Sequence, residues 1–557
     1  MFRRQNLCWL TAVLWLGCEG QIDAPLPRVA VPTAHADDEV LRTQDEKLFD
    51  LATRYFPGQD PSPGSTRLSR LTRPQLDATT RALLPMQYGA SAVAALPRDP
   101  LQKNYEYAAN LGFTPVNFTP YLKWVEPKVE GVRANPGGVI ACAAGNSACL
   151  DTEARKFVAR AFRGVVTEAR LATFAAFYLA NTAQLGVADA TADLVDVTLH
   201  SPGYVFREEI QVDAAGLLAP AQQLQNLTYV LADAPPEALA MSSATPQLYL
   251  QTPEELAKTV DRILATPEAR AKLLGFFVAW LEIKAADELT LSPSTYPSFT
   301  PAVAAAALEE TQRFLEFYLG KPSPKLKDLT QSTQSFVSQP LAAIYQLTQT
   351  PLNGATLIDL DPATRLGLFT QPAVIASHSG PTSTRLVKRG VFFTRKVMCL
   401  PLGAVPSDVN TMLPVTNGQT ERERIEPPTQ AAKCAGCHSF INPFGFVQEN
   451  YDADGKWRTT DNGVAINAAI SVSFLDEGKL ETQSPVTALK AFTSSARFKQ
   501  CFVRQLFRFY MGRDEEPGDD PLLRKMFFGF ARNDEQDLIG LLRMLATSSH
   551  FSQRVAR

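Results

Sequence analysis

The sequence predicts a mainly α-helical protein of several domains. Its 557 residues are too many for one hydrophobic core, so we expect two to four domains. Apolar residues recur at the three- and four-residue spacing of amphipathic helices, for example at Phe157, Ala161 and Phe162. Between 356 and 475, Pro, Gly, Thr and Asn become frequent, which indicates a loop-rich domain within the helical protein.

The first eighteen residues have the organisation of a targeting segment. Arg3 and Arg4 provide positive charge, and Leu7–Leu16 is an apolar run too short to span a bilayer. The run ends in glycine and Cys18, which is typical of a bacterial lipobox, although Trp15 stands where Leu is expected. An ordinary signal peptide with a chance cysteine is the alternative. We predict lipidation at Cys18, and hence a periplasm-facing or cell-surface lipoprotein of a Gram-negative bacterium, held to the membrane by its lipid.

The composition along the chain predicts one linker and five folded regions. Residues 19–65 are rich in Pro, Ala and Asp, and we expect a flexible tether there. The folded regions expected after this tether are a helical and loop-rich domain over 66–150, a helical domain over 151–198, a central helical domain over 199–355, the loop-rich domain over 356–475 and a C-terminal helical domain over 476–557.

Several helix boundaries follow from local signals. Thr72 and Thr167 are expected to cap helices, and Pro267 is expected to open another. The apolar stripe from Leu489 to Phe509 predicts one amphipathic helix. Four prolines within 66–150 are expected to break any long element, namely Pro115, Pro120, Pro127 and Pro136.

The most specific chemical signal is Cys434-Ala-Gly-Cys437-His438. C-x-x-C-H is the attachment signature of c-type haem, because two thiols at this spacing add to the haem vinyl groups and the adjoining imidazole reaches the iron. We therefore predict one covalent haem c, with Cys434 and Cys437 as thioether donors and His438 as an axial ligand. A zinc knuckle lacks a second ligand pair, and a thioredoxin-like redox motif lacks a βαβ setting. A disulfide between the two cysteines stays open as a further alternative.

The second axial ligand distinguishes an electron carrier from an open-site catalyst. His378 and Met412 are the candidates in the same expected domain. Arginines are suited to the haem propionates, because guanidinium groups pair with carboxylates through two hydrogen bonds, and ordinary surface charge is the alternative for each. The candidate propionate partners are Arg389, Arg422 and Arg458.

The eight cysteines can all be assigned if the protein is exported. An oxidising compartment favours thiols that are paired or carry a cofactor. Once the signal segment, the lipobox and the haem motif are assigned, four cysteines remain. Cys142 and Cys149 bracket a short loop suited to a local disulfide, which leaves Cys399 and Cys501 as a long-range pair. Four cysteines allow three connectivities, so this pairing is a prediction.

The stretch Cys434–Arg458 reads C-x-G-C-H-x-x-x-x-P-x-G-F-x-x-E-N-Y-D-x-x-G-x-x-R. Together with shorter stretches, it resembles the multidomain proteins of planctomycetes and myxobacteria that are built from domains of unknown function, including a cytochrome c-like C-x-x-C-H domain. Asn442 departs from that pattern, which usually has Asp. The resemblance spans about 65–555 and implies an exported protein, often a lipoprotein, with haem c, but no known activity. The shorter stretches are Leu68–Thr72, Ala161–Arg163, Leu199–Arg207, Thr370–Ala373, Arg389–Gly390, Cys399–Leu402, Cys501, Tyr510–Arg513 and Ser549–Phe551.

These observations favour a redox function. The net charge is −3 and no basic block is present, so nucleic acid is not an expected partner. No Walker loop, G-x-S-x-G or H-E-x-x-H motif supports nucleotide or hydrolase chemistry. We expect electron transfer with a periplasmic redox partner, as a module of a partner oxidoreductase. The alternatives are a haem-dependent, peroxidase-like oxidoreductase and a non-redox binding scaffold with a structural haem or disulfide. The substrate, a small molecule or a polymer, stays open.

Overall fold

The computed structural model describes most of the chain after residue 34. Over the described residues the protein is mainly α-helical, as predicted, with twenty-two α-helices and four antiparallel sheets of two strands each. None of the described helices is long and apolar enough to cross a membrane. Cys18 and Met412 lie outside the described residues, so their expected roles stay predictions. The described ranges are 35–85, 96–102, 105–106, 111–143, 145–348, 354–404, 418–532 and 536–555.

Five helices form an N-terminal bundle with one shared core. Thr72 and Thr167 cap two of them by accepting hydrogen bonds from backbone N–H groups, as predicted. Side chains from all five meet in one buried cluster, so residue 150 does not divide two cores. The predicted Cys142–Cys149 disulfide ties the first turn of one helix to the loop before it. The five are α3 (Arg73–Leu83), α4 (Pro115–Ala134), α5 (Ser147–Ala161), α6 (Glu168–Leu185) and α7 (Val187–Leu199).

Helix α4 contradicts the expectation that prolines break this region. Its 20 residues continue through Pro120 and Pro127, although each proline removes one backbone hydrogen-bond donor. Pro127 is exposed, where water can satisfy the carbonyl left unpaired. Elsewhere around the helix, Tyr121, Trp124 and Val125 are buried in the bundle core. Burial of these large side chains compensates for the lost hydrogen bonds, and a local proline signal contains no information about that burial.

A second core joins the regions that were expected to form separate central, loop-rich and C-terminal domains. Pro267 opens one of its helices, as predicted, and this helix buries Phe276 and Trp280 against the C-terminal helices. The single helix expected from Leu489 to Phe509 is two helices, because Ser495 has extended backbone and caps the second. The helices here are α9 (Pro220–Ala232), α10 (Pro253–Leu264), α11 (Pro267–Trp280), α18 (Pro485–Ser494), α19 (Ala496–Met511), α20 (Asp520–Arg532), α21 (Leu538–Ala546) and α22 (Ser549–Ser552).

The described part of the expected tether is folded. Helices α1 (His35–Gln44) and α2 (Glu46–Tyr55) lie against α20. Phe49 and Ala52 of α2 are buried, and Arg524 of α20 donates a hydrogen bond of 2.8 Å to Asp38. The compositional signal for a linker was therefore wrong over 35–55, because two short amphipathic faces are covered by a helix distant in sequence.

The region over 356–475 contains more helix than its composition indicated. Its helices are α14 (Pro372–Ser377), α15 (Leu386–Phe392), a π-helix (Phe393–Val397), α16 (Glu421–Thr429) and α17 (Ala432–Phe446). Short strands follow, namely β5 (Thr460–Asp461), β6 (Val464–Ala465), β7 (Ile470–Val472) and β8 (Leu480–Thr482). The region begins with β4 (Thr356–Asp359), which pairs with β3 (Gln334–Val337). Before β3 in the chain come α12 (Pro301–Leu319) and α13 (Leu326–Gln331).

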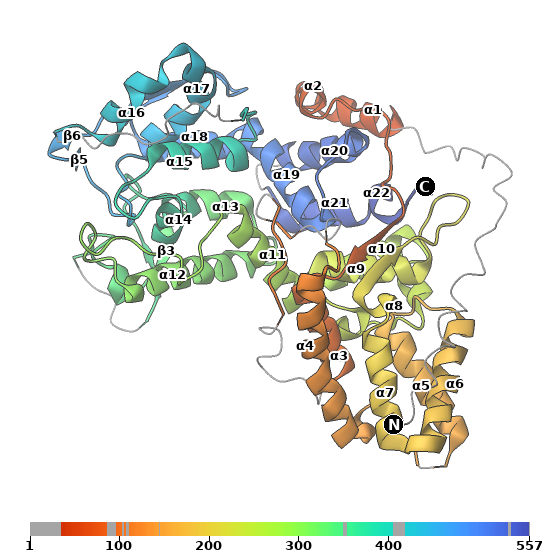
Figure 1. The fold of residues 1–557 in the computed structure, drawn as a ribbon. Coiled ribbons are helices and arrows are strands. Elements are labelled where there is room, and N and C mark those ends of the chain that lie inside the picture. The colour runs from red at the N-terminus through yellow and green to blue at the C-terminus, as the bar shows by residue number, and fades with distance from the viewer. Residues whose placement is uncertain are drawn as a thin grey trace.

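The helices are arranged as two ends and a middle. Figure 1 shows α3–α7 at one end, α12–α18 at another, and α9–α11 with α19–α22 between them. Short 3-10 helices connect several elements, namely Pro136–Gly138, Pro236–Leu239, Pro246–Tyr249, Gln339–Leu341, Leu368–Thr370 and Pro517–Asp519.

A buried carboxylate joins the N-terminal, central and C-terminal parts. β1 (Arg67–Arg70) pairs antiparallel with β2 (Phe206–Glu209), which follows the short helix α8 (Pro202–Val205). Glu209 is fully buried, and its oxygens lie 3.0 Å from Arg67 Nε, 3.2 Å from Arg207 Nη2 and 2.6 Å from Arg554 Nε. Burial alone would raise the pKa of Glu209, but the three arginines hold this pKa well below its usual value.

We predict that Glu209→Gln destabilises the protein by about 3–5 kcal/mol at pH 7, because three guanidinium groups lose their shared anion. Since the folded pKa of Glu209 is lowered, its stabilisation is complete above its unfolded pKa near 4.5 and decreases as the pH falls below that value. Urea unfolding of wild type and variant at pH 7 and in mild acid measures both effects.

The neighbouring Glu208→Gln is the matched control, because Glu208 lies on the same strand and is only partly buried. Equal free energies of unfolding for the two variants at pH 7 would contradict the role assigned to Glu209.

Candidate functional site

The C-x-x-C-H motif lies on a helix and not in a loop. Cys434, Cys437 and His438 belong to α17, where positions three and four residues apart share one side. Farther along, Ile441 and Gly445 continue this side and are buried against α15. The motif residues are only partly buried. The face that packs in the core therefore continues toward the start of α17 as a row of reactive side chains.

The oxidation states of the cysteines agree with the cysteine count. The predicted disulfides Cys142–Cys149 and Cys399–Cys501 are both present. Cys434 and Cys437 are free thiols. Among the described residues no group of three or more His, Cys, Asp and Glu side chains could hold a metal ion, so the zinc-knuckle alternative gains no support there. Two free thiols beside an imidazole are a donor set that fits covalent haem attachment.

A chain of hydrogen bonds fixes the imidazole of His438. Its Nδ1 lies 2.8 Å from Oδ1 of Asn442, and an amide oxygen can only accept, so Nδ1 carries the proton. Asn442 Nδ2 donates to Thr429 Oγ1 at 2.8 Å, and the Thr429 hydroxyl donates to the carbonyl of Ile425 at 2.8 Å. In the neutral ring this hydrogen bond leaves the lone pair on Nε2, which is the tautomer that an iron ligand requires.

A cavity of about 830 Å³ lies beside this imidazole. Its volume is within the range of about 300–1,000 Å³ found for cofactor and small-molecule sites. Helices α16 and α17 and strands β7 and β8 form its walls, which include Phe446, Ile470 and Glu481. His438 lines the cavity, whereas Cys434 and Cys437 lie on the adjacent flank of α17. Of the three motif residues, His438 is therefore the one that lines the cavity.

Arg422 is the only one of the three predicted propionate partners that lines this cavity. Its guanidinium lies 4.8 Å from the ring centre of Phe446 and donates to the carbonyls of Asn467 and Ala469 at 2.8 and 2.6 Å. Two further N–H groups point to Glu426, at 3.1 and 3.3 Å. Of its five N–H groups, four thus have acceptors in the described part of the chain, which leaves one for a ligand.

Arg389 has a structural position, which disagrees with its predicted role at a propionate. It is buried and donates to the carbonyls of Gln448, Tyr451 and Asp452 at 3.1, 2.6 and 2.9 Å, and to Ser379 Oγ at 2.8 Å. Burial lowers the pKa of Arg389 to about 10. The sequence showed an arginine near the motif but not that four acceptors would surround it.

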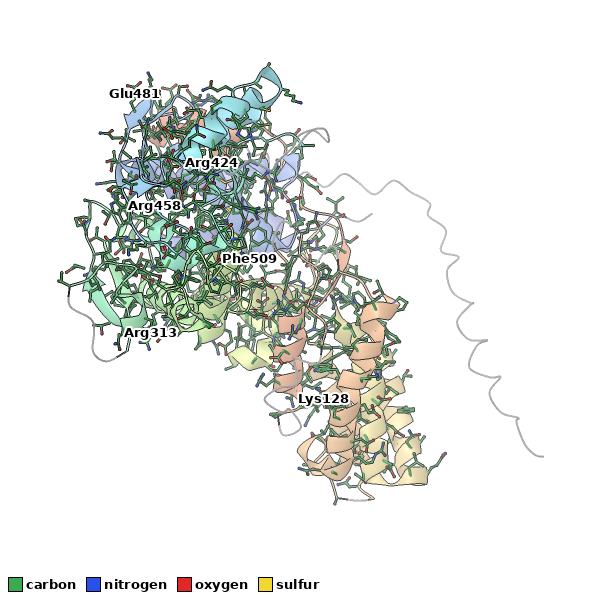
Figure 2. All side chains as sticks on the ribbon, turned by 60° about the vertical axis from the view of Figure 1, so that its left-hand side comes forward. Lys128, Arg313, Arg424, Arg458, Glu481 and Phe509 are labelled. Carbon is green, nitrogen blue, oxygen red and sulfur yellow. A yellow bond between two sulfur atoms is a disulfide. The ribbon has the colours of Figure 1, made fainter. Side chains whose placement is uncertain are left out.

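Arg458 also lies away from the cavity lining. It pairs with Asp461 at 2.9 Å and with Asp452 at 3.3 Å, so its charge is already neutralised. Figure 2 shows Arg458 and Glu481 in the same lobe of the molecule. Proximity in sequence to the motif therefore did not place Arg458 at the site.

His378 is not brought to His438. It is buried, its Nε2 donates to the carbonyl of Leu281 at 2.9 Å, and its ring stacks on Phe392 with the centres 3.8 Å apart. Burial lowers the pKa of His378 to about 3, so the ring is neutral. His378 lines a different cavity, which gives no support to its predicted role as second axial ligand.

Sequence reasoning noted Asn442 as a departure from the family pattern but missed its contact with His438, and it missed Thr429 altogether. A helical reading of the motif would have found Asn442, because positions 438 and 442 are one turn apart. Thr429 lies on another helix, so only the tertiary structure brings it to Asn442.

Helices α15 and α17 cross at close range through two glycines. A Cβ on Gly390 would overlap the backbone oxygen of Ile441, and one on Gly445 would overlap the backbone oxygen of Leu386. Since these neighbours are backbone atoms, they cannot move aside cheaply. The contact fixes α17, and with it His438, relative to α15.

Two family models match parts of the chain. Residues 365–461 match the model described as PSCyt3, protein of unknown function (DUF1588), and residues 218–347 match PSD4, protein of unknown function (DUF1592). The chain carries two domains of unknown function. The first match contains α14–α17 and hence the C-x-x-C-H motif. No curated protein and no solved structure matches the chain.

We predict that Gly390→Ala destabilises the protein by about 1–3 kcal/mol or more, because the added methyl overpacks the α15–α17 contact. Gly436→Ala is the matched control on α17, since nothing lies within 4 Å of the added Cβ. Alanine at this helical position is expected to raise stability slightly, by up to about 1 kcal/mol. Thermal and urea unfolding measure the stability of both variants. A Gly390→Ala protein as stable as wild type would show that the helices do not cross at this distance.

Proposed function

We propose that the protein is an exported haem c lipoprotein that transfers electrons as a redox module of a partner oxidoreductase. The observation that carries this proposal is the single face of α17 with two free thiols and an imidazole whose Nε2 lone pair is available. The other four described cysteines are in disulfides, so Cys434 and Cys437 are the two described cysteines left for a cofactor.

Each residue of the site has a distinct part in this proposal. Cys434 and Cys437 would hold the haem covalently, and His438 would ligate its iron. When bound, haem supplies a one-electron couple whose potential depends on its ligands and on their hydrogen bonds. Asn442 and Thr429 orient the imidazole and keep its proton on Nδ1. Arg422 has one N–H group free for a propionate at the cavity edge.

Export and lipidation at Cys18 rest on the N-terminal sequence. They are consistent with two disulfides, which form in the periplasm and are rare in the cytosol. The lipid would place the protein at a membrane surface, where a periplasmic partner could exchange electrons with it.

A haem-dependent oxidoreductase is the second candidate function. The cavity beside His438 favours it, because about 830 Å³ is room for a small substrate as well as for part of a cofactor. Spectra separate the two candidates. A six-coordinate, low-spin iron supports electron transfer, whereas a high-spin iron that binds cyanide or reacts with peroxide supports the enzyme.

The decisive test is covalent haem. We expect wild-type protein from a host competent for c-type maturation to keep a haem stain after denaturation, and Cys434→Ala and Cys437→Ala to lose most of it. A Cys142→Ser, Cys149→Ser double variant is the control, because it removes two cysteines outside the motif. Absence of covalent haem from the wild-type protein would falsify the proposal.

Asn442→Asp tests how the hydrogen-bond partner of His438 sets the reduction potential of the proposed haem. A carboxylate at Nδ1 makes imidazole more basic and a stronger donor to iron than an amide does. We therefore expect a more negative reduction potential in the haem-loaded variant, measured by redox titration.

Asn442→Leu is the companion variant, because it removes the acceptor for Nδ1 with little change in volume. Here the neutral ring is no longer held in one tautomer, and ring NMR of the haem-free protein should show both. A single Nδ1–H tautomer in this variant, or an unchanged reduction potential in Asn442→Asp, would contradict the role given to the hydrogen-bond chain.

A further inference from the structure

A second cavity, of about 530 Å³, lies against α15, the π-helix and α19. It shares no lining residue with the cavity beside His438. Its volume is also within the range of about 300–1,000 Å³ typical of ligand sites. No part of the proposed redox site uses it, so its role is a separate question.

The lining of this cavity is positively charged. It includes Lys388, Arg395, Lys396 and Arg508, with Glu282 as the carboxylate. Lys396 lies 3.6 Å from Glu282, so this lysine has a counter-ion.

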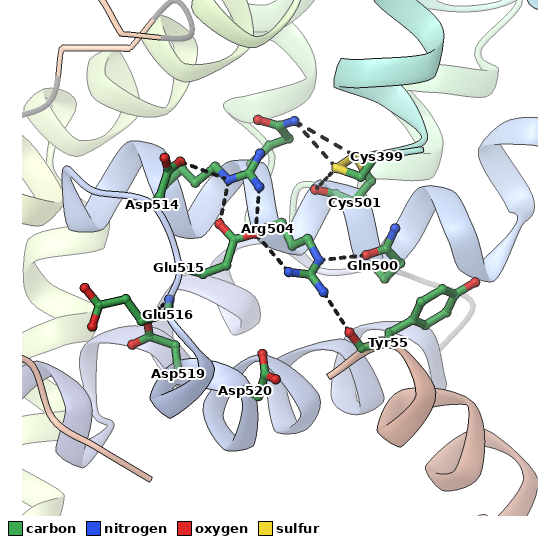
Figure 3. A network of polar contacts seen from close by, with 12 residues as sticks. Tyr55, Cys399, Gln500, Cys501, Arg504, Asp514, Glu515, Glu516, Asp519 and Asp520 are labelled. Atoms are coloured by element: carbon green, nitrogen blue, oxygen red, sulfur yellow. Dashed lines mark hydrogen bonds and ion pairs between the residues drawn. A yellow bond between two sulfur atoms is a disulfide. The ribbon is translucent and has the colours of Figure 1, made fainter. Parts of the chain in front are cut away.

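Arg508 is also neutralised, because it donates two hydrogen bonds of 2.6 Å to the two oxygens of Glu515. Burial raises the pKa of Glu515, but Arg508 and Arg504 outweigh burial and bring this pKa to about 2, so Glu515 is an anion at neutral pH. Figure 3 shows the network of Glu515 and Arg504 beside the Cys399–Cys501 disulfide.

Two cations remain without a carboxylate partner among the described residues. Lys388 donates to the carbonyl of Ser377 at 2.8 Å, which leaves two of its three N–H groups. Arg395 is exposed and has no hydrogen-bond or ion-pair partner in the described part of the chain. Burial and the nearby charges of Lys284 and Arg385 lower the pKa of Lys388 to about 8, as expected where positive charge is in excess.

Apart from Gln505 and Cys399, the rest of the lining is apolar or aromatic. Val391, Phe392, Leu400 and Leu402 contribute side chains, and the neutral ring of His378 stacks on Phe392. A fully hydrated inorganic anion would gain nothing from these walls, whereas an aromatic or aliphatic body would bury apolar surface there. The lining thus combines an apolar surface with two unneutralised cations.

The backbone around the cavity is held in uncommon conformations. Glu282 and Cys399, both in the lining, have positive φ angles of 52° and 47°, and Arg385 before α15 has 50°. Phe393–Val397 is a π-helix, which is rare and is frequent at functional sites. Such conformations persist only where the surroundings impose them, and they cluster at binding sites. The Cys399–Cys501 disulfide fixes this wall to α19.

We propose that this cavity binds a small organic acid with an aromatic or aliphatic body, and that Lys388 and Arg395 hold its anionic group. This site is independent of haem attachment. Its occupant differs from an inorganic anion because the apolar wall contributes to binding, and from a neutral hydrocarbon because the two cations do.

Calorimetry with the full-length protein tests the proposal with three probes. Phthalate carries both an aromatic ring and negative charge, benzyl alcohol carries the ring alone, and inorganic phosphate carries the charge alone. We expect saturable one-to-one binding of phthalate that weakens with salt, and at least tenfold weaker binding of the other two. Arg395→Glu should reduce the affinity for phthalate by tenfold or more, since it replaces an exposed cation that has no partner among the described residues.

Arg270→Glu is the matched control, because Arg270 is an exposed arginine on α11 outside the cavity lining. Lys388→Met is a second variant, expected to weaken phthalate binding while its circular dichroism stays that of wild type. Three outcomes overturn the proposal: no saturable phthalate binding at millimolar concentration, equal affinity in Arg395→Glu and Arg270→Glu, or benzyl alcohol or phosphate binding as tightly as phthalate. Haem staining of the same samples reports separately on the redox site.

Discussion

The close crossing of α15 and α17 is the constraint on which both cavities depend. Gly390 and Gly445 allow the two backbones to meet with no side chain between them, and Arg389 ties α15 to the segment that follows α17. Because the helices cannot slide past each other at this distance, His438 on α17 and Lys388 on α15 keep fixed positions. Each cavity thus uses a different helix of one rigid pair.

The Cys399–Cys501 disulfide reinforces this arrangement, and the two thiols of the C-x-x-C-H motif take no part in the disulfides. The Cys399–Cys501 disulfide joins the end of the π-helix to α19, which is packed in the second core. In the chain-entropy description, closing a loop of about one hundred residues stabilises by roughly 4–5 kcal/mol. Cys434 and Cys437 sit on one turn of α17 and close no such loop, so their pairing would add little to the fold. Their free state is consistent with a chemical role.

Local patterns in the sequence predicted what local physics determines. The caps at Thr72 and Thr167 and the helix that opens at Pro267 follow from backbone chemistry within a few residues, and all three are present. The two disulfides were predicted by assigning each of the eight cysteines to a role. The hydrogen bonds of the buried Arg389 and the continuation of α4 through its prolines depend on groups that are distant in sequence. No local pattern contains that information. For the same reason the composition of 356–475 indicated loops where tertiary packing supports helices.

Asn442 and Thr429 form a matched pair, which explains how an amide orients the imidazole of His438. The hydroxyl proton of Thr429 is committed to the carbonyl of Ile425, so its oxygen can only accept from Asn442. An amide donates there and still accepts from His438 on its other side, whereas a carboxylate has no proton to donate. The imidazole therefore has its orientation fixed without an adjacent negative charge. If the proposed haem is bound, this neutral partner keeps the ligand a weaker donor and the reduction potential higher than a carboxylate would.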